Sequence, residues 1–297
     1  MYFTGFADEA SPDIDQQIQA TKELGWRNIE ARGLYGTNLA GLSDAQFAEL
    51  SEKLAMADVV INCYGSGVAN WASPITEPAD KSYEEMRRAI PRMQALRIPM
   101  IRIMSYEIPV ELRPRNEEFI PEVVKRLKTL VAMAADAGIL CVHENCGGWG
   151  GLSWKHTLRL LEAVDSPSLK LVWDTGNPVF HADVRGNPPY RNQDAWEFYG
   201  KVRDHVVYVH IKDGYVDNDG KTVFTFAGEG KGHVRKVLCD LLSRGYDGGI
   251  SMEPHMASVF HEGEGTRSKA EQCYANYVEY GQRFMALLDH VRRECAG

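Results

Sequence analysis

The stretch Leu169–Asn177 reads LKLVWDTGN, a mostly apolar run that ends in an acidic residue and a turn. Two further stretches repeat this form: Ile139–Asn145 reads ILCVHEN, and Val206–Asp213 reads VVYVHIKD. Strands that are apolar on both faces are typical of a parallel sheet covered by helices on both sides. The three stretches therefore predict buried parallel strands, with polar residues gathered at their carboxyl ends.

Similar apolar segments alternate with helix-period segments along the whole chain. Strands are expected to start near Tyr2, Asn28, Val59, Met100, Ile139, Leu169, Val206 and Gly248, and helices near Pro12, Asp44, Tyr83, Glu117, Lys155, Ala195, Val234 and Lys269. Eight such units predict an α/β fold, a single (β/α)8 TIM barrel. An open doubly wound sheet would require a glycine-rich phosphate loop after the first strand, and Phe3–Glu9 (FTGFADE) contains none.

No linker or change in composition divides the chain, so residues 1–297 are expected to form one domain. The helix at about 268–293 is expected to pack on the barrel or on a partner chain, and a homo-oligomer is an open expectation. Ser11 before Pro12 and the pair Ser43 and Gln46 read as helix caps. Left-handed glycines are expected to end three helices, at Gly25, Gly138 and Gly245.

The composition restricts the choice of partners. The chain of 297 residues has 33 Lys and Arg against 41 Asp and Glu, a net charge of −8, which argues against nucleic acid. Its longest apolar segment, Leu130–Leu140, is too short to cross a membrane, and Met1–Glu9 does not resemble a signal peptide. Six scattered cysteines, including Cys141 and Cys146, are expected to be reduced thiols of a cytoplasmic protein.

Four potential metal ligands end consecutive predicted strands: Glu144, Asp174, His210 and Glu253. Each is about one strand–helix unit from the next, so all four should meet at the mouth where barrel enzymes hold their catalytic groups. Three buried carboxylates repel one another unless a cation lies between them. Three oxygen ligands and one imidazole suit one divalent metal ion, with Mn²⁺ the leading candidate and Mg²⁺, Co²⁺ or Zn²⁺ the alternatives.

The quartet and its strand contexts resemble the sugar phosphate isomerase/epimerase family, the xylose-isomerase-like TIM barrels that include ketose 3-epimerases and inosose dehydratases. The segments Asp174–Asn177 and His210–Asp213 and the turn Gly228–Gly230 are similar to those of the family. The resemblance implies a metal at the quartet and a small-molecule sugar as substrate, although the sequence has no glycine-rich cradle for a phosphate.

The resemblance also implies the reaction, in which Glu144 and Glu253 act as acid and base on opposite faces of a ketose or keto-sugar. One removes a proton beside the carbonyl to form an enediolate, and the other returns it, as in an isomerase or epimerase. Loss of a β-substituent from the same intermediate would make the protein a lyase or dehydratase acting on a keto-sugar or keto-inositol.

The chain departs from the ketose epimerases at two positions. Those enzymes tend to have a histidine where this chain has Asn177, and the nearest histidine here is His181. His143 stands directly before Glu144, and strand alternation turns it away from Glu144 unless the strand end distorts. His143 is therefore expected either to pack against a helix or to act as the base.

Further candidates for substrate binding stand near the same mouth: Lys212, His181, Asn177, His255, Glu30 and Arg32. Arg185 and the loop tryptophans Trp71, Trp149 and Trp154 could contact a sugar or serve only packing and solvation. Two other functions remain open, a repair endonuclease of the related barrel type and a non-catalytic binder. The acidic charge and the single quartet argue against the first, and only turnover distinguishes the second.

Overall fold

A computed structural model describes residues 1–256 and 269–295. Its main sheet has eight parallel strands in the order β1-β10-β7-β6-β5-β4-β3-β2. The strands are β1 (Tyr2–Gly5), β2 (Asn28–Ala31), β3 (Val60–Gly65), β4 (Met100–Ile103), β5 (Leu140–Glu144), β6 (Leu169–Asp174), β7 (Val206–Ile211) and β10 (Gly249–Met252). Phe6 and Glu30 form an isolated parallel bridge that nearly closes the sheet between β1 and β2. The TIM barrel is confirmed, and the open sheet was the wrong alternative.

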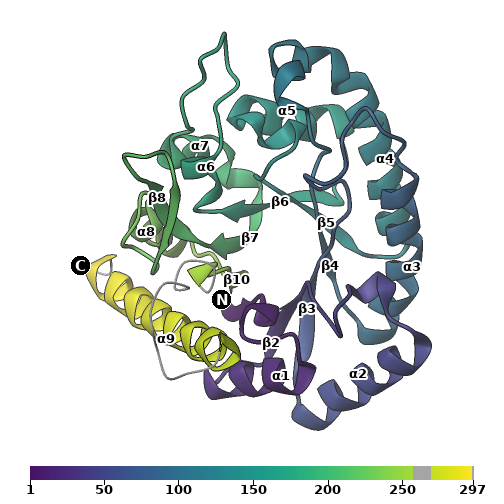
Figure 1. Cartoon of the computed structure of the whole chain (residues 1–297), viewed down its shortest axis with the longest axis vertical. Helices are drawn as coiled ribbons and strands as arrows, with labels where there is room; N and C mark the ends of the chain where they lie inside the picture. The colour runs from purple at the N-terminus through teal and green to yellow at the C-terminus, as the bar shows by residue number, and fades with distance from the viewer. Residues whose placement is uncertain (257–268, 296–297) are drawn as a thin grey trace.

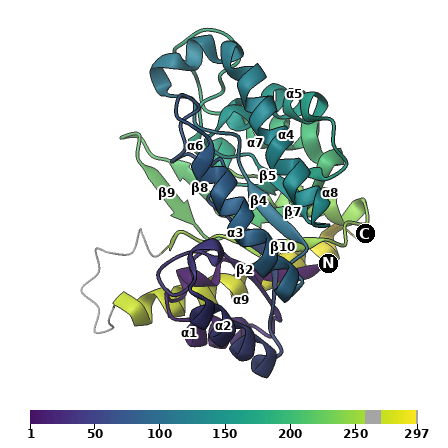
Figure 2. The ribbon, with the colours of Figure 1, turned by 90° about the vertical axis from the view of Figure 1, so that its right-hand side faces the viewer.

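Helices surround the strands, as Figures 1 and 2 show. They are α1 (Ile14–Glu23), α2 (Asp44–Ala57), α3 (Asp80–Leu96), α4 (Ile120–Asp136), α5 (Trp154–Val164), α6 (Asn177–Phe180), α7 (Ala195–Val202), α8 (Val234–Ser243) and α9 (Lys269–Cys295). Short 3-10 turns, at Ala7–Glu9, Leu39–Gly41, Val110–Phe119, Trp149–Leu152 and Arg203–His205, lie in the loops. None of the helices in the described part of the chain is long and apolar enough to span a bilayer.

The structure confirms the predicted helix caps except at the start of α1. Ser43 and Gln46 form the predicted capping box, and Gly25, Gly138 and Gly245 have φ between 69° and 74°. The cap of α1, however, is Asp13 and not Ser11: its carboxylate accepts hydrogen bonds from the backbone of the next turn. Ser11 instead accepts the N–H of Asp13, because it stands two residues before the cap position of the helix.

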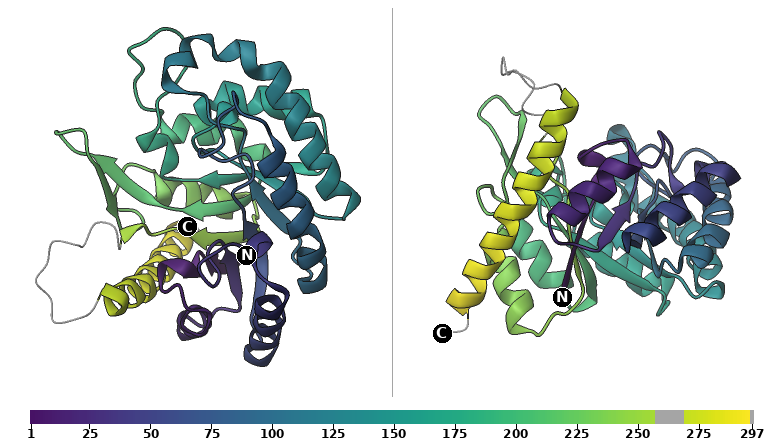
Figure 3. Two further views of the ribbon diagram at one scale, coloured as in Figure 1. Left: turned by 45° about the vertical axis from the view of Figure 1, so that its right-hand side comes forward. Right: turned by 90° about the horizontal axis from the view of Figure 1, so that it is seen from below.

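Helix α9 packs on the barrel, along α1 and α8 (Figure 3). Its buried face carries Tyr277, Tyr280, Phe284 and Leu288, spaced at three and four residues. This packing brings Cys295 of α9 to Cys239 of α8, and the two form a disulfide. The expectation of reduced thiols was wrong for this pair, because a contact across 56 residues of sequence leaves no local signal. The other four cysteines are free, and burial raises the pKa of Cys141 to about 12.

The disulfide predicts a thiol count. Unfolded without reductant, the protein should show four reactive thiols, and six after reduction. Cys239→Ser should show one more thiol than the unaltered protein, because Cys295 is released, whereas the matched change Cys273→Ser should show one fewer. Titration with a thiol reagent in denaturant measures all three, and six thiols in the unreduced protein would contradict the pairing.

Candidate active site

Strand alternation places the candidate ligands inside the barrel. A small buried layer fills its interior: Cys63, Val142, Val172 and Tyr208. Two residues further along β5, β6 and β7 stand Glu144, Asp174 and His210, which therefore point inward on the same face of each strand. Glu253 follows β10 and donates its backbone N–H to the carbonyl of Ile211 in the neighbouring strand. The sheet thus brings together the four predicted ligands.

The quartet is compact and closed to solvent. Its four residues are at most 4 % exposed, and one potential ligand atom of each lies within 4.8 Å of the others. Burial of this many carboxylates is costly unless cations compensate their charge.

His210 is held with one ring nitrogen free. Its Nε2 lies 3.0 and 3.2 Å from the two carboxylate oxygens of Glu30, so Nε2 carries a proton and donates it. Nδ1 faces Glu144 at 3.7 Å and has no hydrogen-bond partner among the described residues. A carboxylate behind the outer nitrogen of a histidine is the arrangement that orients a metal-binding imidazole.

The two carboxylate oxygens of Asp174 differ in their hydrogen bonding. Its Oδ1 accepts the backbone N–H groups of Gly176 and Asn177, at 2.9 and 2.6 Å. Its Oδ2 lies 3.1 Å from Lys212 Nζ as an ion pair, but within the described chain it accepts no hydrogen bond. Burial raises the pKa of Asp174 to about 6, and the Lys212 ammonium limits the rise.

Glu144 is held ionised by a cation from β4. Its Oε2 accepts a hydrogen bond from Arg102 at 3.1 Å, and its Oε1 accepts one from the amide of Asn177 at 2.8 Å. Burial opposes ionisation, but the charge of Arg102 brings the pKa of Glu144 down to about 2.

Glu253 is compensated by three cationic groups. Lys212 Nζ lies 2.8 Å from Oε2, and Arg32 and His255 lie 3.0 and 3.3 Å from Oε1. Burial opposes ionisation here too, but Lys212 and His255 hold the pKa of Glu253 well below its usual range. Burial would likewise lower the pKa of Lys212, yet Asp174 and Glu253 raise it well above its usual range.

The residues present fit a divalent metal ion. The free Nδ1 of His210 and the unsatisfied Oδ2 of Asp174 converge with one oxygen from each of Glu144 and Glu253, a donor set of three oxygens and one nitrogen. A bound divalent ion would polarise a substrate carbonyl and stabilise negative charge on its oxygen.

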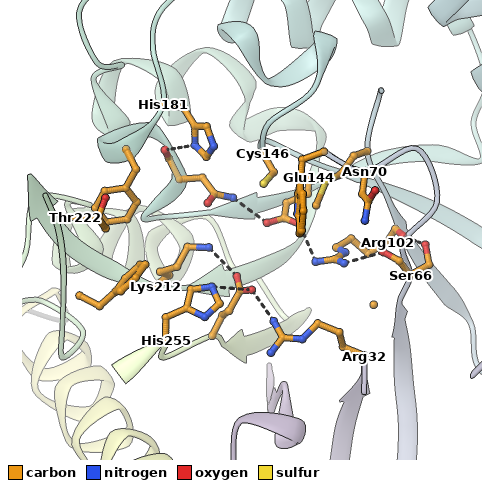
Figure 4. A pocket seen from close by; sticks show the side chains of 18 of the residues that line it. Arg32, Ser66, Asn70, Arg102, Glu144, Cys146, His181, Lys212, Thr222 and His255 are labelled. Carbon is orange, nitrogen blue, oxygen red and sulfur yellow. Dashed lines mark hydrogen bonds and ion pairs between the residues drawn. The ribbon is translucent and has the colours of Figure 1, made fainter. Parts of the chain in front are cut away.

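A pocket of about 780 Å³ opens above the quartet (Figure 4). Strand ends supply its charged floor, which includes Arg32, Arg102 and Lys212. The two long loops that follow β3 and β6 contribute side chains to its walls, among them Trp71 and His181. Asn177 and His255, both predicted from sequence, line it as well.

Four predicted site residues are not among the described residues that line this pocket: the quartet members Asp174 and His210, and also His143 and Glu30. His143 lies on the opposite face of β5, where its Nε2 lies 3.0 Å from Ser105 Oγ and burial lowers its pKa to about 4. Glu30 lies beneath the quartet and binds His210 and the hydroxyl of Tyr208. The geometry favours the packing alternative for His143 and places Glu30 behind His210 instead of at the pocket surface.

Sequence reasoning missed Arg102, although the same strand-end argument applies to it. It is the penultimate residue of β4, on the inward face, is buried, and also donates to the carbonyl of Ser66 at 2.7 Å. Two residues that could have contacted a sugar do not line the pocket. Arg185 forms ion pairs with Asp183 and Glu197, and Trp149 is fully buried.

Asp213 anchors the wall formed by the hairpin of β8 (Asp213–Val216) and β9 (Thr222–Thr225). Its carboxylate accepts four backbone N–H groups, those of Gly214, Gly228, Gly230 and Gly232, at 2.8–3.0 Å. A Cβ at Gly230 would meet an Asp213 oxygen at 2.3 Å, so only glycine permits this approach. The glycine-rich turn therefore fixes the hairpin beside the pocket.

The donor set predicts the effect of single changes on metal binding. Asp174→Asn and Glu253→Gln should each weaken Mn²⁺ binding at least about tenfold, because each removes a charged ligand. Asp136→Asn, an exposed carboxylate at the end of α4, is the matched control and should bind Mn²⁺ like the unaltered protein. Calorimetric titration with Mn²⁺, alongside circular dichroism to confirm folding, measures this. Unchanged affinity in both site variants would refute the ligand assignment.

Comparisons with known proteins agree with this architecture. A D-tagatose 3-epimerase-like protein superposes with a TM-score of 0.71 at 19 % identity, over 99 % of each chain. A probable 3-DHS dehydratase from Bacillus anthracis gives 0.66 at 15 % identity, over 96 % of this chain and 99 % of that one. A xylose isomerase-like TIM barrel protein from Mycobacterium smegmatis, in complex with magnesium, gives 0.65 at 19 % identity, over 92 % and 88 %.

In sequence, an uncharacterised protein of Methanocaldococcus jannaschii is 31 % identical over 144 residues, which is 46 % of this chain and 44 % of that protein. The match therefore spans less than half the length of this curated relative. A family model described as a xylose isomerase-like TIM barrel matches residues 18–276. The chain belongs to the xylose isomerase-like TIM barrel family.

Proposed function

We propose that the protein is a divalent-metal-dependent sugar isomerase or epimerase that works through an enediolate of a ketose or keto-sugar. The observation that carries this proposal is the buried quartet, in which Nδ1 of His210 and Oδ2 of Asp174 have no hydrogen-bond partner among the described residues and lie close to two ionised glutamates. Structural relatives named as a D-tagatose 3-epimerase-like protein and a D-allulose 3-epimerase support it.

The two glutamates approach a bound sugar from different sides. Glu144 comes from β5 and Glu253 from the end of β10, and β6 and β7 lie between these strands in the sheet. Both carboxylates are ionised, so either can accept a proton from the carbon beside a carbonyl. The other can return a proton to the opposite face, and so invert the centre, after it has taken that proton from solvent in the open pocket. The first glutamate then releases its proton to solvent, which restores the starting state.

Lys212 supplies positive charge where negative charge develops. Its ammonium is buried and stays protonated between Asp174 and Glu253. A fixed donor in a site shielded from water stabilises an oxyanion more strongly than the same group does in solution. Arg102 and Arg32 hold the two glutamates in place and keep them ionised.

Elimination is a second candidate, and the position of Lys212 favours it. The ammonium that donates to Glu253 could also give a proton to a leaving oxygen of a bound substrate. The relative named as a probable 3-DHS dehydratase supports this alternative. A lyase or dehydratase would share the first proton abstraction and differ only in the product.

Proton exchange tests the shared step. The Mn²⁺-loaded protein is incubated in D₂O with a panel of ketoses and keto-sugars. It should introduce deuterium at one carbon of a substrate, and proton NMR measures the loss of that carbon's proton signal. Chelation of the metal should abolish exchange. A new vinylic signal would identify the lyase, and lack of exchange across the panel would contradict both reactions.

Two variants separate the residues that act in this step. Lys212→Met should lower the exchange rate at least about 10²-fold with Mn²⁺ still bound, because the oxyanion loses its donor. His143→Gln, a change on the opposite face of β5, should stay within a few-fold of the unaltered rate. A comparable loss in His143→Gln with metal retained would instead make His143 part of the catalytic machinery.

A further inference from the structure

The pocket is larger than a free monosaccharide needs. Its volume is about 780 Å³. A hexose has about twelve heavy atoms, and each takes up less space than a liquid water molecule at ~30 Å³, so the sugar fills at most about half of the pocket. Pockets of this size are typical of ligands the size of a drug molecule.

One wall carries an exposed tryptophan on a fixed loop. Trp71 lines the pocket, yet its side chain is 63 % exposed, which is unusual for so large an apolar group. The backbone around it is tied to the segment after β4: Tyr106 donates to the carbonyl of Ala69, and Glu107 donates to that of Ser73. The ring is therefore presented to the pocket by backbone hydrogen bonds on both sides.

The facing wall is also aromatic. Phe180 of α6 and Phe224 of β9 line the pocket, and their rings meet edge to face at 5.3 Å. Phe224 also packs edge to face on His255, at 5.1 Å, beside the charged floor. Figure 4 shows Thr222 of β9 and Asn70 of the β3 loop on opposite sides of the pocket, and Phe224 and Trp71 belong to these two segments.

The charged floor and the aromatic walls suit two different parts of one molecule. We infer that the substrate is a keto-sugar bearing a planar apolar substituent, and that Trp71, Phe180 and Phe224 form the subsite that binds this substituent. The inference rests on the proposed function, since the sugar part lies on the quartet. Aromatic rings pack well against a flat apolar group, and the anchoring of the hairpin by Asp213 keeps Phe224 in place before the ligand arrives.

Matched glycosides test the subsite without turnover. The probes are the phenyl and methyl β-glycosides of glucose, galactose and xylose, titrated calorimetrically into the Mn²⁺-loaded protein. In at least one pair the phenyl glycoside should bind about tenfold more tightly than the methyl glycoside. Trp71→Ala should reduce this preference to within about twofold. Val110→Ala, which shortens an exposed apolar side chain outside the residues that line the pocket, should keep it.

Equal affinities for phenyl and methyl glycosides, no measurable binding of either, or a phenyl preference that survives Trp71→Ala would each overturn the inference. Failure of the subsite and failure of the reaction are distinguishable. Deuterium exchange on free ketoses without any phenyl preference would remove the subsite alone. A Trp71-dependent phenyl preference without exchange on any sugar would remove the proposed reaction and keep the subsite.

Discussion

The rest of the site depends on one constraint, which is the burial of three carboxylates at the barrel mouth. These carboxylates stand at the carboxyl ends of β5, β6 and β10. Such groups remain ionised inside a protein only when cations offset the loss of hydration. Arg102 and Lys212 provide part of that charge and line the pocket at the same time. The groups that stabilise the fold at the barrel mouth are therefore also those that a substrate would meet.

A second layer decides how the quartet can act. Glu30 and Tyr208 stand one level deeper, and Glu30 fixes the outer nitrogen of His210. This leaves Nδ1 of His210 facing Glu144, so the imidazole is oriented before any metal arrives. Above the floor, the loops after β3 and β6 and the hairpin β8–β9 add walls of a different, aromatic character.

The sequence predicted the layers that depend on short-range patterns. Short apolar runs located the starts of all eight barrel strands to within about one residue, and the spacing of the strand ends placed Glu144, Asp174 and His210 at one mouth of the barrel. Features that depend on distant segments were not predictable in this way. The Cys239–Cys295 pair, the ion pair of Arg102 with Glu144 and the four hydrogen bonds to Asp213 each join parts of the chain that no local pattern relates.

The central claim is that His210 offers Nδ1, and the three carboxylates offer one oxygen each, to a single divalent ion. Anomalous diffraction from crystals soaked in Mn²⁺ tests it most directly. We expect one strong peak among Glu144, Asp174, His210 and Glu253, bound through Nδ1 of His210. Crystals with no peak at the quartet, or with a peak bound through Nε2 in place of Glu30, would contradict it.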